Sequence, residues 1–284
     1  MTDFPRTVVS GVSLPRMLIG TNWILGYSHT GAAADTMICN RHADPEFTAQ
    51  VLNAYMSYGI DAVMGPTRAF DADCGLRRAM DAVSEKYNRP ITQIVTPGIN
   101  VDDNADARKE AEATIRHCAK NGAKFCLIHH YSAEQLVCKN THTINRLPDY
   151  LDMIRQNGMI PGLSAHMPEL VQFSDENEYD VQTYIQIYNC LGFMMQVEVE
   201  TVNRIIWSAK KPVMSIKSMA AGRCTPFVGL TFSYATLRPC DMVTLGAFTP
   251  EEVHEDVEIA LATIEHRHPN LSKRNSPVVS TLLK

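Results

Sequence analysis

Two glutamates at alternate positions of one apolar segment are the residues whose placement folding explains least. The segment FMMQVEVE, residues 193–200, alternates apolar and polar side chains with the period of two that predicts a β-strand. Gln196, Glu198 and Glu200 lie on the polar side of this predicted strand. An unpaired carboxylate buried between covering elements would cost several kcal/mol. We therefore interpret the two glutamates as members of a reactive site.

Two histidines at the ends of other apolar segments complete a set of metal-ligating side chains. His129 lies at the end of segment 124–130, and His166 follows segment 159–165. Two imidazoles and one carboxylate with an open position are typical of catalytic Zn²⁺ or Mn²⁺ centres. We predict His129, His166 and Glu198 as metal ligands and Glu200 as a catalytic base or a support for the ligands. The alternative is that each histidine only forms hydrogen bonds in the core.

A lysine at the end of segment 213–217 is predicted to be catalytic. An amine at this place can form a Schiff base with a carbonyl substrate if burial lowers its pKa. As the simpler alternative, the Lys217 ammonium neutralises Glu198 or binds a substrate anion. The AAGR turn, which ends at Arg223, is also predicted to hold a phosphate through backbone N–H groups. The residues predicted to contact substrate are Asn22, Trp23, His29, Ser164, Gln196 and Arg223.

Short apolar segments alternate with longer amphipathic ones along the whole chain. The alternation favours a parallel sheet in one domain, and eight such units predict a (β/α)₈ TIM barrel over residues 1–284. In such barrels the carboxyl ends of the strands form the reactive face. The predicted strands are 17–21, 60–65, 91–96, 124–130, 159–165, 193–200, 213–217 and 241–246. The predicted helices are 45–58, 74–87, 104–120, 145–157, 177–190, 201–210, 226–237 and 250–266.

Composition and charge exclude several classes of partner. A net charge of −5 without a long basic run argues against binding to nucleic acid or to an anionic membrane. No segment has the length and hydropathy of a membrane span or of a signal peptide. The eight cysteines have no disulfide-framework spacing, which predicts reduced thiols in the cytoplasm. A small-molecule substrate is the remaining expectation.

The last third of the sequence resembles the aldo-keto reductases. The residues that carry the resemblance are KPVMSIKSMAAGR and DMVTLGAF, which are similar to the lysine-bearing strand, turn and last strand of that family. PGLSAHMPEL resembles its fifth strand. MQVEVE resembles its sixth strand, with Gln196 where the family has a glutamine beside the nicotinamide. The resemblance implies a TIM barrel and binding of NADP.

The departures from that family concern its proton donor. The resemblance implies an Asp and a Tyr after the second strand and a Lys after the third. In this chain Met64 or Gly65 stands at the position of the Asp, and Pro97 stands at the position of the Lys. His129 matches the family's fourth-strand histidine. We therefore predict a metal-assisted lyase, isomerase or hydrolase acting on a small sugar-like or phosphorylated molecule, with NADP the less expected cofactor. A nicotinamide-dependent oxidoreductase with another proton donor and an inactive ligand-binding barrel are the alternatives.

Overall fold

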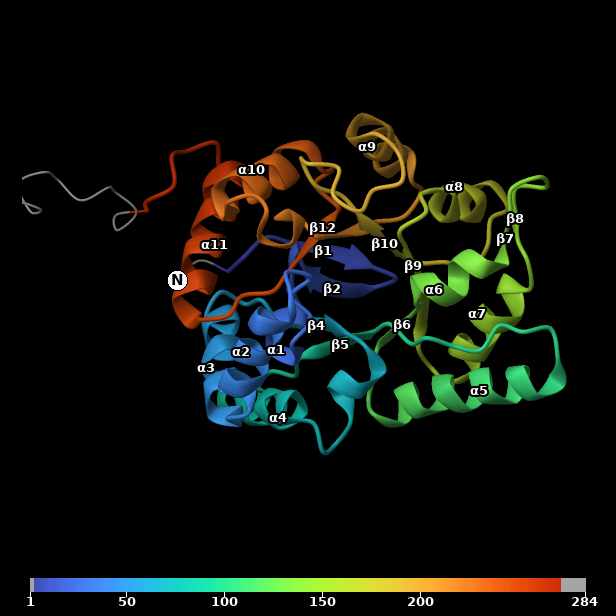
Figure 1. Cartoon of the computed structure of the whole chain (residues 1–284), viewed down its shortest axis with the longest axis horizontal. Coiled ribbons are helices and arrows are strands. Elements are labelled where there is room, and N and C mark those ends of the chain that lie inside the picture. Colours follow the sequence, from blue (N-terminus) through green and yellow to red (C-terminus); the bar gives the residue numbers. More distant parts are fainter. Residues whose placement is uncertain (1–2, 272–284) are drawn as a thin grey trace, which may run out of the picture.

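The computed structural model describes residues 3–271, and its centre is a closed barrel of eight parallel strands (Figure 1). Each strand is hydrogen-bonded to its neighbours in the order β10-β11-β12-β3-β4-β5-β6-β9. The predicted TIM barrel is therefore confirmed. The barrel strands are β3 (Met17–Gly20), β4 (Ala62–Gly65), β5 (Thr92–Val95), β6 (Phe125–Ile128), β9 (Ile160–Ala165), β10 (Tyr184–Ile187), β11 (Val213–Ile216) and β12 (Met242–Leu245).

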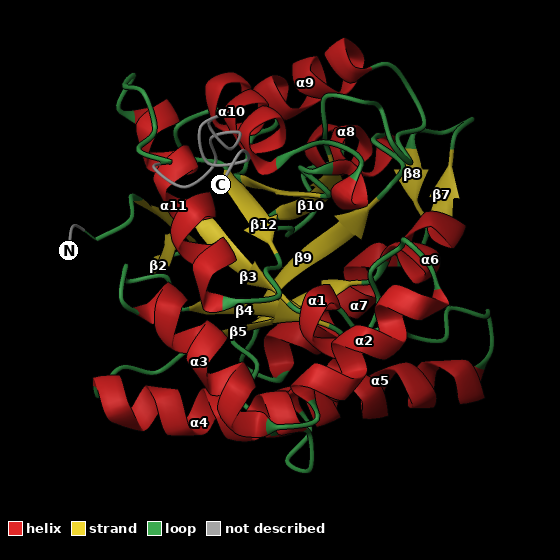
Figure 2. Ribbon diagram, turned by 60° about the vertical axis from the view of Figure 1, so that its left-hand side comes forward, coloured by secondary structure: helices red, strands yellow, loops and turns green. Residues whose placement is uncertain are grey.

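Helices surround this barrel on the outside, as Figure 2 shows. The longer ones are α2 (Ala32–His42), α3 (Pro45–Met56), α4 (Gly75–Tyr87), α5 (Ala105–Lys120), α7 (Leu147–Gln156), α8 (Glu169–Glu176), α9 (Val199–Ser208), α10 (Pro226–Thr236) and α11 (Pro250–Ile264). Short helical turns follow several strands, and they are α1 (Asn22–Leu25), η1 (Thr67–Phe70), α6 (His130–Ala133), η2 (Glu134–Leu136) and η3 (Ala220–Gly222). Two antiparallel hairpins complete the fold, β1 (Arg6–Val9) with β2 (Val12–Pro15), and β7 (Val137–Cys138) with β8 (Thr143–Ile144).

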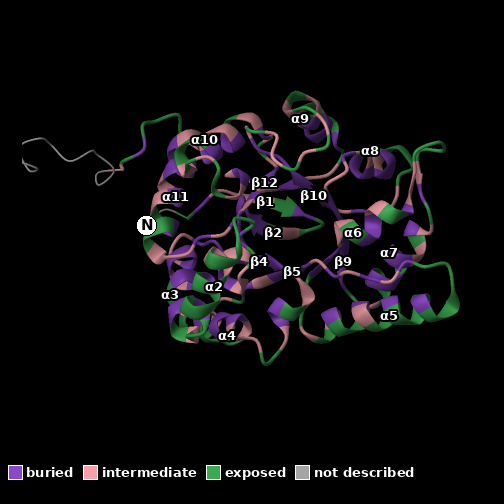
Figure 3. Cartoon of the chain, viewed as in Figure 1, coloured by how far each residue is buried: buried purple, intermediate pink, exposed green. Residues whose placement is uncertain are grey.

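The barrel strands are buried on both faces, as Figure 3 shows. One set of side chains fills the barrel interior, and it includes Leu18, Phe125, Leu127 and Met214. The alternate side chains point outward against the helices, because successive residues of a strand face opposite sides. Polar side chains can therefore reach solvent only beyond the strand ends.

The prediction is wrong for the sixth barrel strand. That strand is β10, whose four residues YIQI are all buried, and it lies inside the predicted helix 177–190. The segment predicted as a strand instead forms a loop followed by the first turn of α9. Glu198 is the N-cap residue of α9, and Val202, Ile205 and Ile206 are its buried residues. Two valines at the start of an amphipathic helix thus imitate strand alternation over a few residues.

Several other predictions at the level of elements are confirmed. The other seven predicted strands each overlap a barrel strand, and the Asp44-Pro45 and Thr249-Pro250 pairs begin α3 and α11. Both caps accept backbone hydrogen bonds, at Glu46 N and Glu252 N.

All eight cysteines are free thiols. In the described part of the chain no helix has the length and hydropathy needed to cross a membrane. The single domain over residues 1–284 stays a prediction, since residues 1–2 and 272–284 lie outside the described residues.

A buried ion pair at the amino end of the barrel joins the last two strands. Asp241 has no exposed surface, and its Oδ1 accepts hydrogen bonds from Arg238 Nη2 at 2.7 Å and from Val213 N at 2.9 Å. Its Oδ2 accepts from Arg238 Nε at 2.8 Å. Asp241 thereby ties the first residue of β11 to the residue before β12. Removal of the carboxylate would leave the Arg238 guanidinium without its counter-charge and the Val213 N–H without its acceptor.

We expect Asp241→Ala to lower the free energy of unfolding by about 3–5 kcal/mol, because it breaks a buried pair on one side. Urea unfolding followed by circular dichroism measures this loss. Asp149→Ala is the matched control, since Asp149 forms an exposed pair with Arg108 at 2.9 Å. The control should change stability by about 0–1 kcal/mol. Equal effects of the two substitutions would contradict the structural role of Asp241.

Candidate active site

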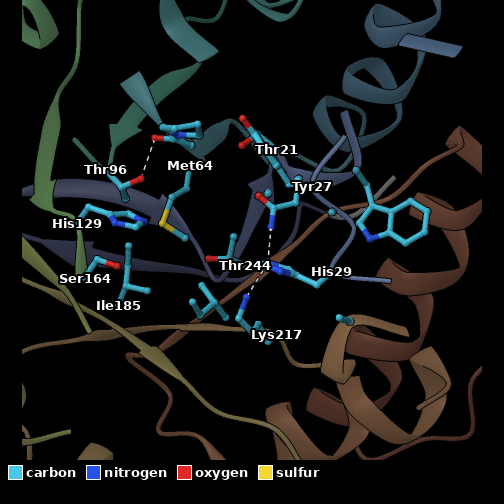
Figure 4. A pocket seen from close by; sticks show the side chains of 18 of the residues that line it. Thr21, Tyr27, His29, Met64, Thr96, His129, Ser164, Ile185, Lys217 and Thr244 are labelled. Carbon is cyan, nitrogen blue, oxygen red and sulfur yellow. Dashed lines mark hydrogen bonds between the residues drawn. The ribbon is translucent and has the colours of Figure 1, made fainter. Parts of the chain in front are cut away.

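A pocket of about 670 Å³ opens at the carboxyl ends of the barrel strands. Its wall contains residues from each of the eight barrel strands or from the loop directly after the strand. This is the face on which TIM-barrel enzymes carry their catalytic groups. Figure 4 shows His129 and Ser164 on one side of the pocket and His29 and Lys217 on the other, with Thr244 between them.

Most residues predicted from the sequence line this pocket. Lys217 follows β11, Ser164 lies in β9, and the loop after β3 supplies the others from the first third of the chain. Strand ends converge because the barrel closes, so residues far apart in sequence meet there. The predicted residues that line the pocket are Asn22, Trp23, His29, His129, Ser164, His166 and Lys217.

The predicted residues of segment 193–200 do not reach the pocket. Gln196, Glu198 and Glu200 are exposed and belong to α9 or the loop before it, so their predicted contacts with substrate or metal are wrong. The physical reason is the misplaced sixth strand. The β10 side chain that lines the pocket is Ile185, whereas its neighbour Gln186 faces the opposite side and contacts the His166 carbonyl oxygen at 3.4 Å.

The predicted metal centre is also wrong. His129 and His166 both line the pocket, but their third ligand Glu198 is exposed on the outer helix layer. Within residues 3–271 no group of three or more His, Cys, Asp or Glu side chains has the geometry of a metal site. Two imidazoles alone do not make the three-ligand set on which the prediction rested.

Arg223 lies beside the pocket rather than in its wall. Its exposed guanidinium stacks over the Phe193 ring at 3.9 Å and donates to the Ala220 carbonyl oxygen at 3.2 Å. Ala221 and Gly222 of the same turn do line the pocket, with φ angles of 55° and 82°. The predicted contact between this turn and a phosphate stays a prediction.

The sequence prediction missed a third imidazole between His129 and His166. The His130 ring stacks on the His166 ring with a centroid distance of 3.7 Å and an interplanar angle of 16°. Its centroid lies 4.3 Å from that of His129. His130 is the first residue of α6 and lines the pocket. The sequence signal was the His129-His130 pair at a strand end, with an acid four residues later.

That acid is Glu134, and its carboxylate contacts the residues at one end of the imidazole cluster. Its Oε1 accepts hydrogen bonds from His166 N at 2.6 Å and Met167 N at 2.8 Å. Its Oε2 lies 3.9 Å from His130 Nδ1. Burial opposes ionisation of this carboxyl group, yet the His130 ring and the two backbone N–H groups lower its pKa. The carboxylate therefore lies against the His130 ring at one end of the imidazole cluster.

The two flanking histidines are neutral at physiological pH. Burial, and next the positive charge of a protonated His130, lower the pKa of His129 to about 4. The same two causes lower the pKa of His166 to about 4. A neutral imidazole can give a hydrogen bond without bringing a charge into the pocket. His129 Nδ1 is buried and has no hydrogen-bond partner in the described structure.

The other side of the pocket carries a lysine without an acidic partner. Lys217 Nζ lies 2.9 Å from His29 Nε2, and Asn22 Nδ2 lies 3.3 Å from the same nitrogen. Burial lowers the pKa of Lys217. Partial burial and then Lys217 lower the pKa of His29, so that its ring is an acceptor for the ammonium. No ion pair joins Lys217 to a carboxylate in the described part of the chain.

Comparison with solved structures identifies the fold. The barrel matches two solved structures from Pseudomonas aeruginosa, each described as that of an aldo-keto reductase. In one the TM-score is 0.61 with 12% identity over 91% of this chain and 95% of that chain, and in the other 0.62 with 12% identity over 92% and 97%. A glycerol dehydrogenase from Gluconobacter oxydans matches with a TM-score of 0.54 and 14% identity over 96% and 99%. The chain has an aldo-keto-reductase-like TIM barrel.

These matches correct the functional prediction. No family model matches the sequence, and no curated protein matches it significantly. The solved structures reported above are described as aldo-keto reductases and a glycerol dehydrogenase, so the predicted metal-assisted lyase, isomerase or hydrolase is wrong. The loss of Glu198 from the site removes the observation on which the metal-assisted prediction depended.

The neutral histidines predict a loss of stability in acid. Their folded-state pKa values of about 4 lie below the unfolded value of about 6.5, so the unfolded chain binds protons that the folded chain does not. The free energy of unfolding should therefore be full above pH 7 and fall as the pH drops from about 6.5 towards 4. His42, whose pKa burial also lowers to about 4, adds to this slope.

His129→Asn should reduce the slope of the free energy of unfolding against pH. The reduction is at most the contribution of one proton, which is about 1.4 kcal/mol per pH unit. Urea unfolding at several pH values between about 4.5 and 7.5 measures the slope. Ser164→Ala is the control, because it alters the pocket without removing a titrating group. An unchanged slope in His129→Asn would contradict a neutral, buried ring.

Proposed function

We propose that the protein is a nicotinamide-dependent oxidoreductase that acts on a carbonyl group with a proton donor other than tyrosine. The main support for this proposal is the composition of the pocket wall. The wall contains His129, which is neutral and follows the fourth barrel strand, and among the described residues it has no Asp or Glu side chain. Eight free cysteines support a reducing, cytoplasmic setting.

The residues present fit a nicotinamide dinucleotide. A volume of about 670 Å³ is within the usual range for cofactor sites. Arg68 lines the pocket and Arg223 stands beside it, and neither is paired with a carboxylate in the described part of the chain. Two guanidinium groups without acidic partners suit the diphosphate of such a molecule. Ser164, which is buried in the wall, can give a hydrogen bond to a carboxamide.

The imidazole side of the pocket suits a carbonyl group. A bound reduced nicotinamide would supply a hydride to the carbonyl carbon. The neutral His129 ring can donate a hydrogen bond to the carbonyl oxygen and so polarise it. Met64 and Ile185 line the same region and exclude water from it. In these apolar surroundings, the hydrogen bond from His129 stabilises negative charge on the carbonyl oxygen more strongly than it would in water.

His130 is the group we assign as proton donor. Its Nδ1 lies 3.9 Å from the Glu134 carboxylate, which favours this orientation of the ring. The side chain keeps 27% of its surface exposed, so solvent can return the proton after each turnover. The proton leaves His130 for the carbonyl oxygen, and the ring is left neutral. His130 thus takes the role for which the related reductases use a tyrosine.

We expect the wild-type protein to bind NADPH, as measured by quenching of protein fluorescence. His130→Gln should lower kcat for aldehyde reduction by about 10²- to 10⁴-fold, the usual contribution of a general acid. Its Kd for NADPH should stay unchanged, because His130 acts on the substrate oxygen. His117→Gln is the control, since His117 lies on the outer surface beside Asp71.

Two results would overturn the proposal in different ways. Absence of NADPH binding to the wild-type protein would remove the nicotinamide function as a whole. Full activity of His130→Gln would leave the function in place and contradict only the proton donor. Glu134→Gln should also lower kcat, because the glutamine removes the charge that favours this orientation of the His130 ring.

A further inference from the structure

Two cysteines lie in contact beside the pocket, although they are 34 residues apart in the sequence. Cys190 belongs to the loop after β10, Cys224 lies between η3 and α10, and their sulfur atoms are 4.0 Å apart. Cys224 Sγ also lies 3.9 Å from the Ser218 carbonyl oxygen. Both cysteines are half-buried, so small molecules in solvent can reach the pair. A disulfide bond is about 2.05 Å long, so the sulfur atoms need to approach by about 2 Å to form one.

The two loops hold the sulfur atoms in this arrangement. On one side Asn189 is fully buried, and its side chain accepts from Phe193 N at 2.9 Å and donates to the Phe193 carbonyl oxygen at 3.0 Å. On the other side, Cys224 N donates to the Met219 carbonyl oxygen at 3.4 Å. The Arg223 guanidinium stacks over the Phe193 ring at 3.9 Å and so joins the same two loops. The contact between the thiols therefore does not depend on the cysteines alone.

A second pair of neighbouring cysteines differs from this one in access. Cys118 of α5 forms a side-chain hydrogen bond with Cys126 of β6. Their exposed fractions are 2% and 0%, so an oxidant in solvent does not reach them. Cys190 and Cys224 combine contact with access, which are the two conditions for a disulfide that forms in the folded protein.

The surroundings of the pair assign an order to the oxidation. Burial, and next the neighbouring Cys190, raise the pKa of Cys224 to about 11, so the Cys224 thiol keeps its proton at neutral pH. Because the thiolate is the nucleophile, we assign the first attack to Cys190. Its thiolate attacks one oxygen of hydrogen peroxide, the O–O bond breaks, and a sulfenic acid and hydroxide form. The Cys224 sulfur then attacks the Cys190 sulfur, the S–O bond breaks, and the departing hydroxide takes the Cys224 proton. Two thiols and one hydrogen peroxide thus give one disulfide and two water molecules.

We propose that Cys190 and Cys224 form a reversible disulfide that restrains the pocket wall on the β11 side. The turn directly before Cys224 supplies Ala221 and Gly222 to this wall. Ala220 and Ala221 have φ angles of 50° and 55°, a conformation that persists only where surrounding contacts hold it. The disulfide adds a covalent bond next to this turn and ties it to the loop after β10. Peroxide therefore stiffens one wall of the pocket, and thiol reductants release it.

The first test is peptide mapping by mass spectrometry after treatment of the wild-type protein with hydrogen peroxide. We expect one cross-link within the chain, between the peptides that contain Cys190 and Cys224, with the loss of two hydrogen atoms. Dithiothreitol should reverse it. Cys138→Ser is the matched control, because Cys138 is also half-buried, and it should leave the cross-link unchanged. Absence of the cross-link, a link to another chain, or a Cys118–Cys126 link in its place would overturn the proposal.

Single variants test the order of the two steps. In Cys224→Ala, peroxide should leave Cys190 as a sulfenic acid, which dimedone traps. In Cys190→Ala, Cys224 should stay a thiol. The reverse pattern would overturn the assignment of the first attack to Cys190, and the absence of dimedone labelling in both variants would overturn the peroxide step.

The third test measures the mobility of the pocket wall by hydrogen exchange. The amides of Gly222, Arg223 and Cys224 donate to carbonyl oxygens of the same turn. In the oxidised protein they should exchange at least about tenfold more slowly than in the reduced protein, because the disulfide opposes opening of the turn. The Tm should also rise by about 5–10 °C, since the cross-link restricts the unfolded chain. Peroxide treatment of Cys190→Ala should change neither quantity. A cross-link without slower exchange would contradict the restraint of the pocket wall.

Discussion

Closure of the parallel barrel is the constraint on which the rest of the structure depends. Each strand has two neighbours, interior side chains on one face and helices on the other, so no barrel edge or open face is left for polar groups. Chemistry is therefore confined to the strand ends. The carboxyl ends bring together side chains from every part of the sequence, and the pocket forms where they meet.

The polar groups on the two sides of the pocket differ in charge. Burial keeps His129 and His166 neutral, while Glu134 holds a carboxylate against His130 at the edge of the cluster. Across the barrel mouth, Lys217 has a neutral imidazole as its partner. The same physical cause, the removal of water from a narrow site, thus produces neutral donors on one side and an unbalanced cation on the other.

The likeness to the solved aldo-keto reductase structures is one of architecture. His129 follows the fourth barrel strand, but Met64 and Pro97 occupy strand ends at which that family carries charged groups. A barrel can keep its core while its strand ends change, because core packing and site chemistry depend on different residues. The His130–Glu134 pair is a feature of this chain, and it places two ionisable side chains beside the altered strand ends.

The sequence by itself determined the barrel and about half of the site. His129, Ser164, His166 and Lys217 were predictable, because each lies in or directly after an apolar segment whose strand type follows from length and alternation. The sixth strand was not predictable, since the four residues YIQI give too short a pattern and VEVE imitates a strand where a helix begins. Only the tertiary structure decided that Glu198 lies outside and that His130 stacks on His166. Such contacts depend on which strand ends the closed barrel brings together, and local periodicity carries no information about that.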